Sequence, residues 1–301
     1  MKFPVSPPAL LVSSVLASCQ VGAQLVGPAS VNINRRSFEP ATNYSSSCSA
    51  AHISIPPITG LEVVSVEASV VLNASVNIDW DVINNVFPVG KVTGLNYCNV
   101  TVTSIHPGYR EKGIKTGVYL PLSGWNERMM GVGGSGFISG NIPGRVEAPV
   151  YLGFATVSTS AGVSKYTMSD YATENFNSDL WALRSTGNVD LEVLSDFSYR
   201  ALGDAAAIGK AVIESFYKIT PKFRYFNGCS AGGRQAHMLA QRYPDAYHGL
   251  LGGSPAINWA RMVPAELAPQ VVLKEVSGGV VPPPVRIQCY HGGRTRSLRR
   301  H

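Results

Sequence analysis

Residues 223–235 read FRYFNGCSAGGRQ, and this run predicts a strand, a tight turn and the start of a helix. Aromatic side chains that favour β-structure precede the turn. After the turn, apolar side chains recur with helical spacing from Ala236 to Tyr243, and Pro244 ends the run. We therefore expect the functional site where this strand passes into this helix.

The turn carries the pattern Gly-x-Ser-x-Gly, with Ser230 between Gly228 and Gly232. In such a turn the serine is held in a strained conformation that exposes its hydroxyl, and the glycines prevent clashes between strand and helix. We therefore predict that Ser230 is a catalytic nucleophile. Because the first N–H groups of a helix lack intrahelical partners, the Ala231 N–H is a predicted oxyanion donor.

A second glycine-rich segment, GVGGSGF at residues 131–137, follows a strand predicted from Arg128 to Val132. One alternative is a nucleotide-binding loop, but no Gly-Lys-Ser/Thr sequence and no obvious helix start accompany it. Another alternative is a flexible turn. We favour a loop whose N–H groups at Gly133 and Gly134 complete an oxyanion hole.

Strands and helices alternate along the chain. Short runs of alternating apolar and polar residues predict strands between Ile53 and Val102, and an amphipathic helix is predicted from Ser198 to Tyr217. Further strands are predicted at residues 100–105, 117–122, 153–159 and 248–254. The alternation predicts an α/β fold with a mostly parallel sheet flanked by helices. Reactive groups collect at the carboxyl ends of such strands, where Ser230 lies.

Residues 1–23 have the features of a secretory signal: Lys2, an apolar run from Ala9 to Leu16, and small residues before a cleavage site at Gln24. The run is too short to span a bilayer, so a membrane anchor is the weaker alternative. Three Asn-x-Ser/Thr sequons are candidate glycosylation sites: Asn43, Asn73 and Asn99. Together these features predict a secreted, extracellular protein.

The chain has five cysteines, of which Cys19 leaves with the signal. Cys48 and Cys98 could pair in an oxidising compartment, Cys229 directly precedes the nucleophile, and Cys289 lies near the C-terminus, so the connectivity stays open. No Cys/His spacing suggests zinc and no Asp-x-Asp loop suggests calcium. We therefore predict no metal site.

The formal net charge of +6 would be compatible with a nucleic-acid partner, but the excess of basic residues is concentrated in one terminal segment. Residues 285–301 hold five arginines and no acidic residue, which leaves 20 basic and 19 acidic residues elsewhere. The basicity belongs to a tail, so neither nucleic acid nor a membrane is the expected partner. The predicted division is a signal at 1–23, the N-terminal part of a catalytic domain at 24–284, and a disordered or mis-spliced tail at 285–301.

Three segments carry a family resemblance: YFNGCSAGGRQ at 225–235, QRYPD at 241–245 and GGSPAINW at 252–259. They resemble the tannase and feruloyl esterase family of secreted α/β-hydrolases. The resemblance extends back through WNER at 125–128 and covers about residues 48–262.

The resemblance implies hydrolysis of phenolic-acid esters, feruloyl or galloyl, on small molecules or polysaccharides, with Ser230 attacking the carbonyl. It implies a disulfide from Cys229 to a cysteine beside the catalytic histidine. It also implies a lid after Asn258-Trp259, usually carrying calcium, followed by the acid and the histidine. Because the last residues do not resemble these parts, we expect an α/β-hydrolase sheet truncated before the lid and the last strands, without a cofactor.

The acid and the histidine are not identified from the sequence, although in α/β-hydrolases they follow the serine in that order. The residues considered are Asp245, a turn residue; His237, which we expect to point away from the hydroxyl; His248, which begins the next strand and for which we expect a packing or surface role; His52 and His106, which precede the serine; and His291. A serine ester hydrolase is the predicted function. The alternative is an inactive secreted fragment or a phenolic-ester-binding protein.

Overall fold

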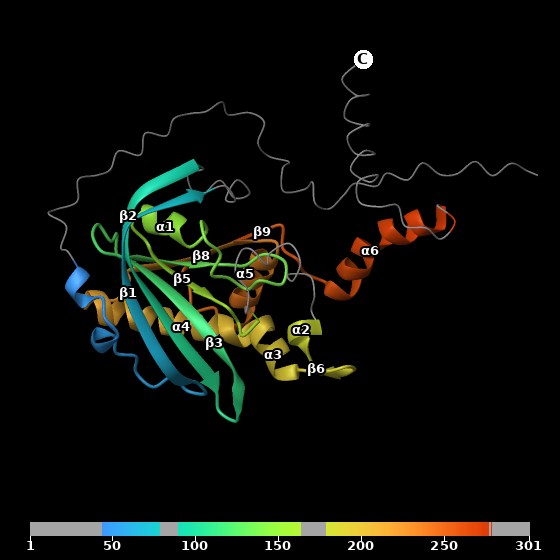
Figure 1. Ribbon diagram of the computed structural model, residues 1–301, viewed down its shortest axis with the longest axis horizontal. Coiled ribbons are helices and arrows are strands. Elements are labelled where there is room, and N and C mark those ends of the chain that lie inside the picture. The colour runs from blue at the N-terminus through green and yellow to red at the C-terminus, as the bar shows by residue number, and fades with distance from the viewer. Residues whose placement is uncertain (1–43, 79–89, 164–178, 277, 279–301) are drawn as a thin grey trace, which may run out of the picture. The chain divides into compact units, whose positions relative to one another are not determined.

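The computed structural model describes residues 44–78, 90–163, 179–276 and 278 (Figure 1). The predicted signal, Asn43 and the predicted tail at 285–301 lie outside the described residues. One compact unit ends at Pro255, and a second begins at Ala256, so each is described by itself.

Seven strands of the first unit form one sheet in the order β1-β2-β3-β5-β4-β8-β9. Their bounds are β1 Glu62–Ile78, β2 Gly90–His106, β3 Tyr109–Pro121, β4 Arg128–Val132, β5 Ala155–Thr159, β8 Phe223–Cys229 and β9 Gly249–Gly253. Neighbours from β1 to β5 pair antiparallel, whereas β5, β4, β8 and β9 pair parallel. The predicted α/β-hydrolase-like sheet is confirmed, and its parallel half holds the serine turn.

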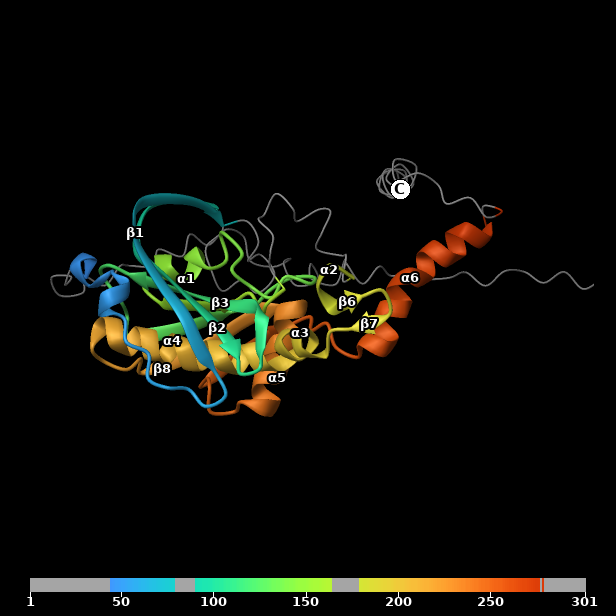
Figure 2. The same cartoon turned by 60° about the horizontal axis from the view of Figure 1, so that its bottom comes forward.

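Helices cover both faces of this sheet. The helical segments of the first unit are α1 Glu147–Tyr151, α2 Asp179–Ala182, α3 Leu191–Ser195, the π-helical segment η6 Asp196–Arg200, α4 Ala201–Tyr217 and α5 Ala231–Arg242. Of these, α1, α4 and α5 pack on the strands of the sheet. Figure 2 shows α4 and α5 on one face and α1 on the other. A small hairpin, β6 Leu183–Ser185 with β7 Asn188–Val189, lies between α2 and α3 in the chain.

The core has two layers because successive strand residues point to opposite faces. Met129 of β4 packs in the cluster that contains Ile208 and Val212 of α4, while its neighbour Met130 packs in the cluster that contains Ala148 of α1. The predicted long helix is confirmed as α4, except that its first turns form the π-helical segment η6.

The antiparallel strands are longer than the short strands predicted between Ile53 and Val102. β1 and β2 each run for 17 residues. Register shifts interrupt their pairing, as between Val71 and Ala74. A bulge shifts the alternation of side chains without ending the strand, so periodicity alone divides one strand into two.

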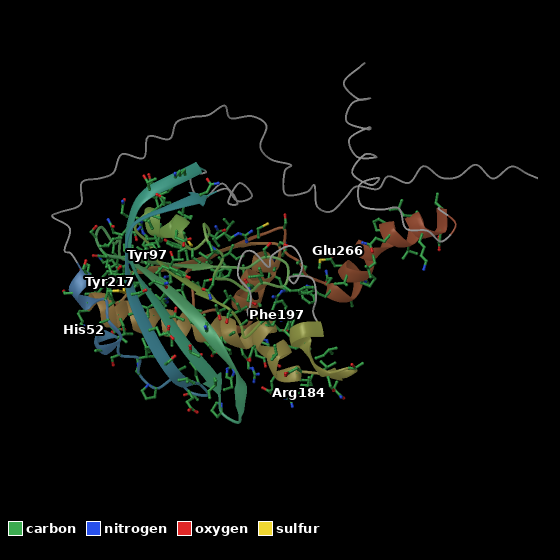
Figure 3. The ribbon with its side chains drawn as sticks, viewed as in Figure 1. His52, Tyr97, Arg184, Phe197, Tyr217 and Glu266 are labelled. Atoms are coloured by element: carbon green, nitrogen blue, oxygen red, sulfur yellow. A yellow bond between two sulfur atoms is a disulfide. The ribbon has the colours of Figure 1, made fainter. Side chains whose placement is uncertain are left out.

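The segment before β1 forms two 3-10 turns, η2 Ser45–Ser47 and η3 Ala50–His52, which the Cys48–Cys98 disulfide links to β2. Its Tyr44 ring contacts Tyr217 edge-on at 4.9 Å, and Trp125 stacks on Tyr217 at 3.9 Å. Figure 3 shows Tyr217 beside this segment, at the opposite end of α4 from Phe197. Among the cysteines that the structure describes, the pairing present is Cys48–Cys98.

The second unit contains α6, Trp259–Val276, which the sequence analysis did not predict. Pro264 and Pro269 lie inside this helix, and none of its residues is buried. Within the described ranges, no helix is both long and apolar enough to cross a membrane.

Candidate active site

The serine turn joins β8 to α5. Ser230 stands between Cys229, the last residue of β8, and Ala231, the first residue of α5, with φ 59° and ψ −115°. Its N–H donates to the Gly253 carbonyl of β9 at 3.1 Å, and its carbonyl accepts the Arg234 N–H at 3.0 Å. These two hydrogen bonds hold a non-glycine residue at a positive φ, a conformation that costs about 1–3 kcal/mol.

The Ser230 hydroxyl takes no part in the helix that follows it. A serine at the N-cap of a helix usually accepts a hydrogen bond from a first-turn N–H. Ser230 makes no such bond, and its side chain is half-buried. The hydroxyl therefore does not cap α5, which is compatible with the predicted role of Ser230 as a nucleophile.

Both glycines of the Gly-x-Ser-x-Gly pattern allow close backbone approach. A Cβ on Gly228 would lie 2.5 Å from the Gly232 carbonyl carbon and oxygen, and one on Gly232 would lie 3.2 Å from the Gly134 carbonyl oxygen. The pattern thus brings strand, helix and the residue 131–137 loop into contact. This is the role that the sequence analysis predicted for Gly228 and Gly232.

The loop glycines do not fit the predicted oxyanion role as the structure places them. The Gly133 N–H donates to the Asn227 carbonyl at 3.0 Å, and the Gly134 N–H donates to the Gln235 amide oxygen at 2.9 Å. Each N–H is used in holding the loop to β8 or α5, so neither is available to an oxyanion. The Ala231 N–H belongs to the first turn of α5, where the neighbouring Gly232 N–H donates to the Gly134 carbonyl at 3.2 Å, and its role stays a prediction.

Gln235 is a site residue that the sequence analysis did not single out. Its side chain is fully buried, and its amide nitrogen donates to the Ser139 carbonyl at 2.9 Å while its oxygen accepts from Gly134. One side chain therefore fixes two points of the loop against α5. The available signal was its position: Gln235 lies one helical turn before Leu239, on the buried face of the helix.

Arg234 connects the serine turn to η6. Its guanidinium lies over the Phe197 ring at 4.6 Å and donates to the carbonyls of Ser198 and Phe197 at 3.3 and 3.5 Å. Burial lowers the pKa of Arg234 to about 10, so the side chain keeps its charge at neutral pH. This contact fixes the first turn of α5 against the segment that leads into α4.

The described histidines all bind groups other than Ser230. His237 bonds the Gly233 carbonyl of its own helix at 2.9 Å, and His248 accepts the Arg224 N–H at 3.0 Å. His106 lies between Asp196 and Asp204, at 3.2 and 3.0 Å, and His52 bonds Ser49 at 2.7 Å. Asp245 is exposed in the turn after α5. No described histidine is hydrogen-bonded to Ser230, and His291 lies outside the described residues.

The remaining predicted residues are accounted for as follows. Asn73 is exposed on β1, whereas the side-chain oxygen of Asn99 on β2 is buried without a hydrogen bond. Cys229 is buried at the end of β8, and the disulfide implied for it stays a prediction. Among the residues that the structure describes, no cluster of three or more His, Cys, Asp or Glu side chains could hold a metal ion.

Comparison with known proteins identifies the family of this chain. The family model described as tannase and feruloyl esterase matches residues 98–290. A "Probable feruloyl esterase" of Arthroderma benhamiae is 38% identical over 60% of this chain and 32% of its own, and a "Tannase" of Aspergillus oryzae is 28% identical over 58% and 28%.

Among solved structures, the tannin acyl hydrolase from Aspergillus niger matches with a TM-score of 0.66 and 27% identity, over 81% of this chain and 42% of its own. The feruloyl esterase B from Aspergillus oryzae shares the fold, with a TM-score of 0.52 and 24% identity over 72% of this chain and 39% of its own. The chain spans about a third of the length of the curated relatives it matches. Since the family model matches more than half of the chain, the chain belongs to the tannase and feruloyl esterase family.

Proposed function

We propose that this chain carries the nucleophile of a secreted carboxylic ester hydrolase that cleaves phenolic-acid esters, feruloyl or galloyl. The observation that carries the proposal is the conformation of Ser230. This serine has φ 59° at the start of α5, and its hydroxyl does not cap that helix. The names of the relatives, feruloyl esterase and tannase, support the substrate class.

In the proposed reaction the Ser230 oxygen attacks the ester carbonyl and forms a tetrahedral intermediate. The Ala231 N–H donates to the developing oxyanion. The serine proton passes to a base and then to the departing alcohol, which leaves an acyl-serine that water hydrolyses to the free acid. None of the described histidines is hydrogen-bonded to Ser230, so we expect the base to be a histidine that the described residues do not include.

The same observation about the histidines favours a second function, the binding of phenolic esters without turnover. A serine hydroxyl without a base is a poor nucleophile at neutral pH. The glycine-lined turn and the Ala231 N–H would then hold an ester carbonyl that is not attacked.

The test compares hydrolysis of methyl ferulate and methyl gallate by the wild type and by Ser230→Ala. Ser69→Ala, at an exposed serine of β1, is the matched control. We expect Ser230→Ala to lower kcat/KM on the order of 10³-fold or more and Ser69→Ala to leave it unchanged. Equal rates in all three proteins would remove Ser230 from catalysis. Saturable binding of methyl ferulate without turnover by the wild type would instead support the second function.

A further inference from the structure

The outer edge of the sheet carries one of the three sequons. β1 is the end strand of the sheet, and within the described residues it pairs only with β2. From Ala68 to Ile78 this strand has no charged residue and no proline, while Val70 and Leu72 are 40% and 64% exposed. A long, uncharged, apolar strand edge invites pairing with another chain, and proteins usually protect such edges with charges, prolines or bulges.

Asn73 lies at a bulge, which is the one of these protective features that this part of β1 has. Val71 pairs with Tyr97 and Ala74 with Leu95, so Leu72 and Asn73 have no register partner in β2. Asn73 has φ 50°, a conformation that asparagine tolerates, and its N–H donates to the Asn96 side chain at 2.8 Å. Asn73 and Ser75 of the sequon are both exposed, and no described residue accepts from the Asn73 side-chain amide.

The Asn99 sequon has the opposite environment. Asn99 lies in β2 between Ser69 of β1 and Tyr119 of β3, and Val100 within the sequon is fully buried. The amide oxygen of Asn99 is buried as well. Asn99 is half-buried and has a paired strand on each side, so a branched sugar chain on this amide has less room than one on the exposed Asn73 at the sheet edge.

We propose that Asn73 carries an N-linked glycan that protects the edge of β1 against pairing with other chains, and that Asn99 is not glycosylated in the folded protein. A glycan is bulky and solubilising, and the bulge presents it beside the exposed Val70 and Leu72. The proposal rests on entry into the secretory pathway, which residues 1–23 predict, and not on the catalytic role of Ser230.

Glycan occupancy is measured on the full chain expressed in a eukaryotic secretory host. Intact mass is measured before and after N-glycosidase treatment for the wild type, Asn73→Gln, Ser75→Ala and Asn99→Gln. Both the secreted and the cell-membrane fractions are measured, so that the result does not depend on export. We expect Asn73→Gln and Ser75→Ala each to lose one glycan and Asn99→Gln to lose none. An unmodified Asn73 peptide in the wild type, or a glycan at Asn99 in folded protein, would overturn the assignment.

The protective role is measured as the aggregated fraction by size-exclusion chromatography with light scattering. We expect Asn73→Gln and Ser75→Ala to increase this fraction several-fold; Ser75→Ala is the matched control because it removes the glycan and keeps Asn73 in its bulge. Adding Leu72→Lys to Ser75→Ala should restore the monomer, since an edge lysine also blocks strand pairing. If the protein without the glycan stays as monomeric as the wild type, the glycan does not protect the edge.

Discussion

At the serine turn, backbone atoms of β8, α5 and the residue 131–137 loop approach so closely that a methyl group on Gly228 would lie 2.5 Å from Gly232. Along β1, at the other end of the sheet, Leu72 is 64% exposed and bulges interrupt the register. The first region is positioned by contacts that no larger residue can replace. The second is an exposed strand edge beside β2, which the Cys48–Cys98 disulfide links to the segment before β1, and in our proposal a glycan protects this edge. The sheet is therefore packed more tightly at the serine turn than along its β1 edge.

The largest expected effect tests the antiparallel half of the sheet, which contains β1, β2 and β3. The Cys48–Cys98 disulfide closes a loop with a sequence separation of 50 residues. Replacing both cysteines by alanine should lower the free energy of unfolding by about 4 kcal/mol, because the unfolded chain regains the entropy that this cross-link removes. The measurement is urea denaturation with and without a reductant. If the variant and the reduced wild type unfold at the urea midpoint of the oxidised wild type, the antiparallel half does not depend on this bond.

The next prediction tests the parallel half of the sheet, which contains the serine turn. Gly228→Ala should lower the free energy of unfolding by about 3 kcal/mol or more, because the new methyl group meets backbone atoms of Gly232 that cannot move aside without shifting α5. Gly249→Ala on β9 is the matched control, since its Cβ would lie 3.1 Å from the Tyr225 ring, which can adjust. Comparable losses in the two variants would show that the turn is no tighter than the adjacent strand.

The parallel half of the sheet, which contains the serine turn, was largely predictable because the sequence patterns that indicate it are local. A strand, a glycine-flanked serine and a helix follow one another within residues 223–243, and the predicted β4 has the observed bounds Arg128–Val132. The roles of Gly133 and Gly134 were not predictable, because their N–H groups bind Asn227 and Gln235, about 100 residues away in sequence. The bulges of β1 were missed for a similar reason: they depend on the register with β2.

Asp196 of η6 connects the antiparallel half of the sheet with the serine turn. Its carboxylate contacts His106 at the end of β2, and the next residue, Phe197, has its ring under the guanidinium of Arg234. Burial raises the pKa of Asp196 to about 6, against the opposing charges of His106 and Arg200. Because the folded carboxyl holds its proton more tightly than the unfolded one, its stabilising contribution is complete below about pH 4 and is lost as the pH rises toward 6.

Asp196→Asn removes this titration. The free energy of unfolding of the variant, relative to the wild type, should rise by on the order of 1–3 kcal/mol between pH 4 and pH 7. Urea denaturation at both pH values measures it, with the exposed Asp245→Asn as the control. Parallel stability curves for the wild type and Asp196→Asn would show that the junction does not titrate in this range.

The smallest expected effect separates the strain of the nucleophile from its chemistry. Ser230→Ala and Ser230→Gly both remove the hydroxyl, but only glycine adopts φ 59° without a steric cost. We expect Ser230→Gly to be more stable than Ser230→Ala by about 1 kcal/mol, because relief of a strain of about 1–3 kcal/mol exceeds the added backbone entropy of the unfolded chain. Ala240→Gly, at an exposed position inside α5, should have the opposite sign and destabilise by about 1 kcal/mol. If both glycine variants destabilise equally, the turn stores no strain, and the hydroxyl is kept from capping α5 by some feature other than the backbone conformation of Ser230.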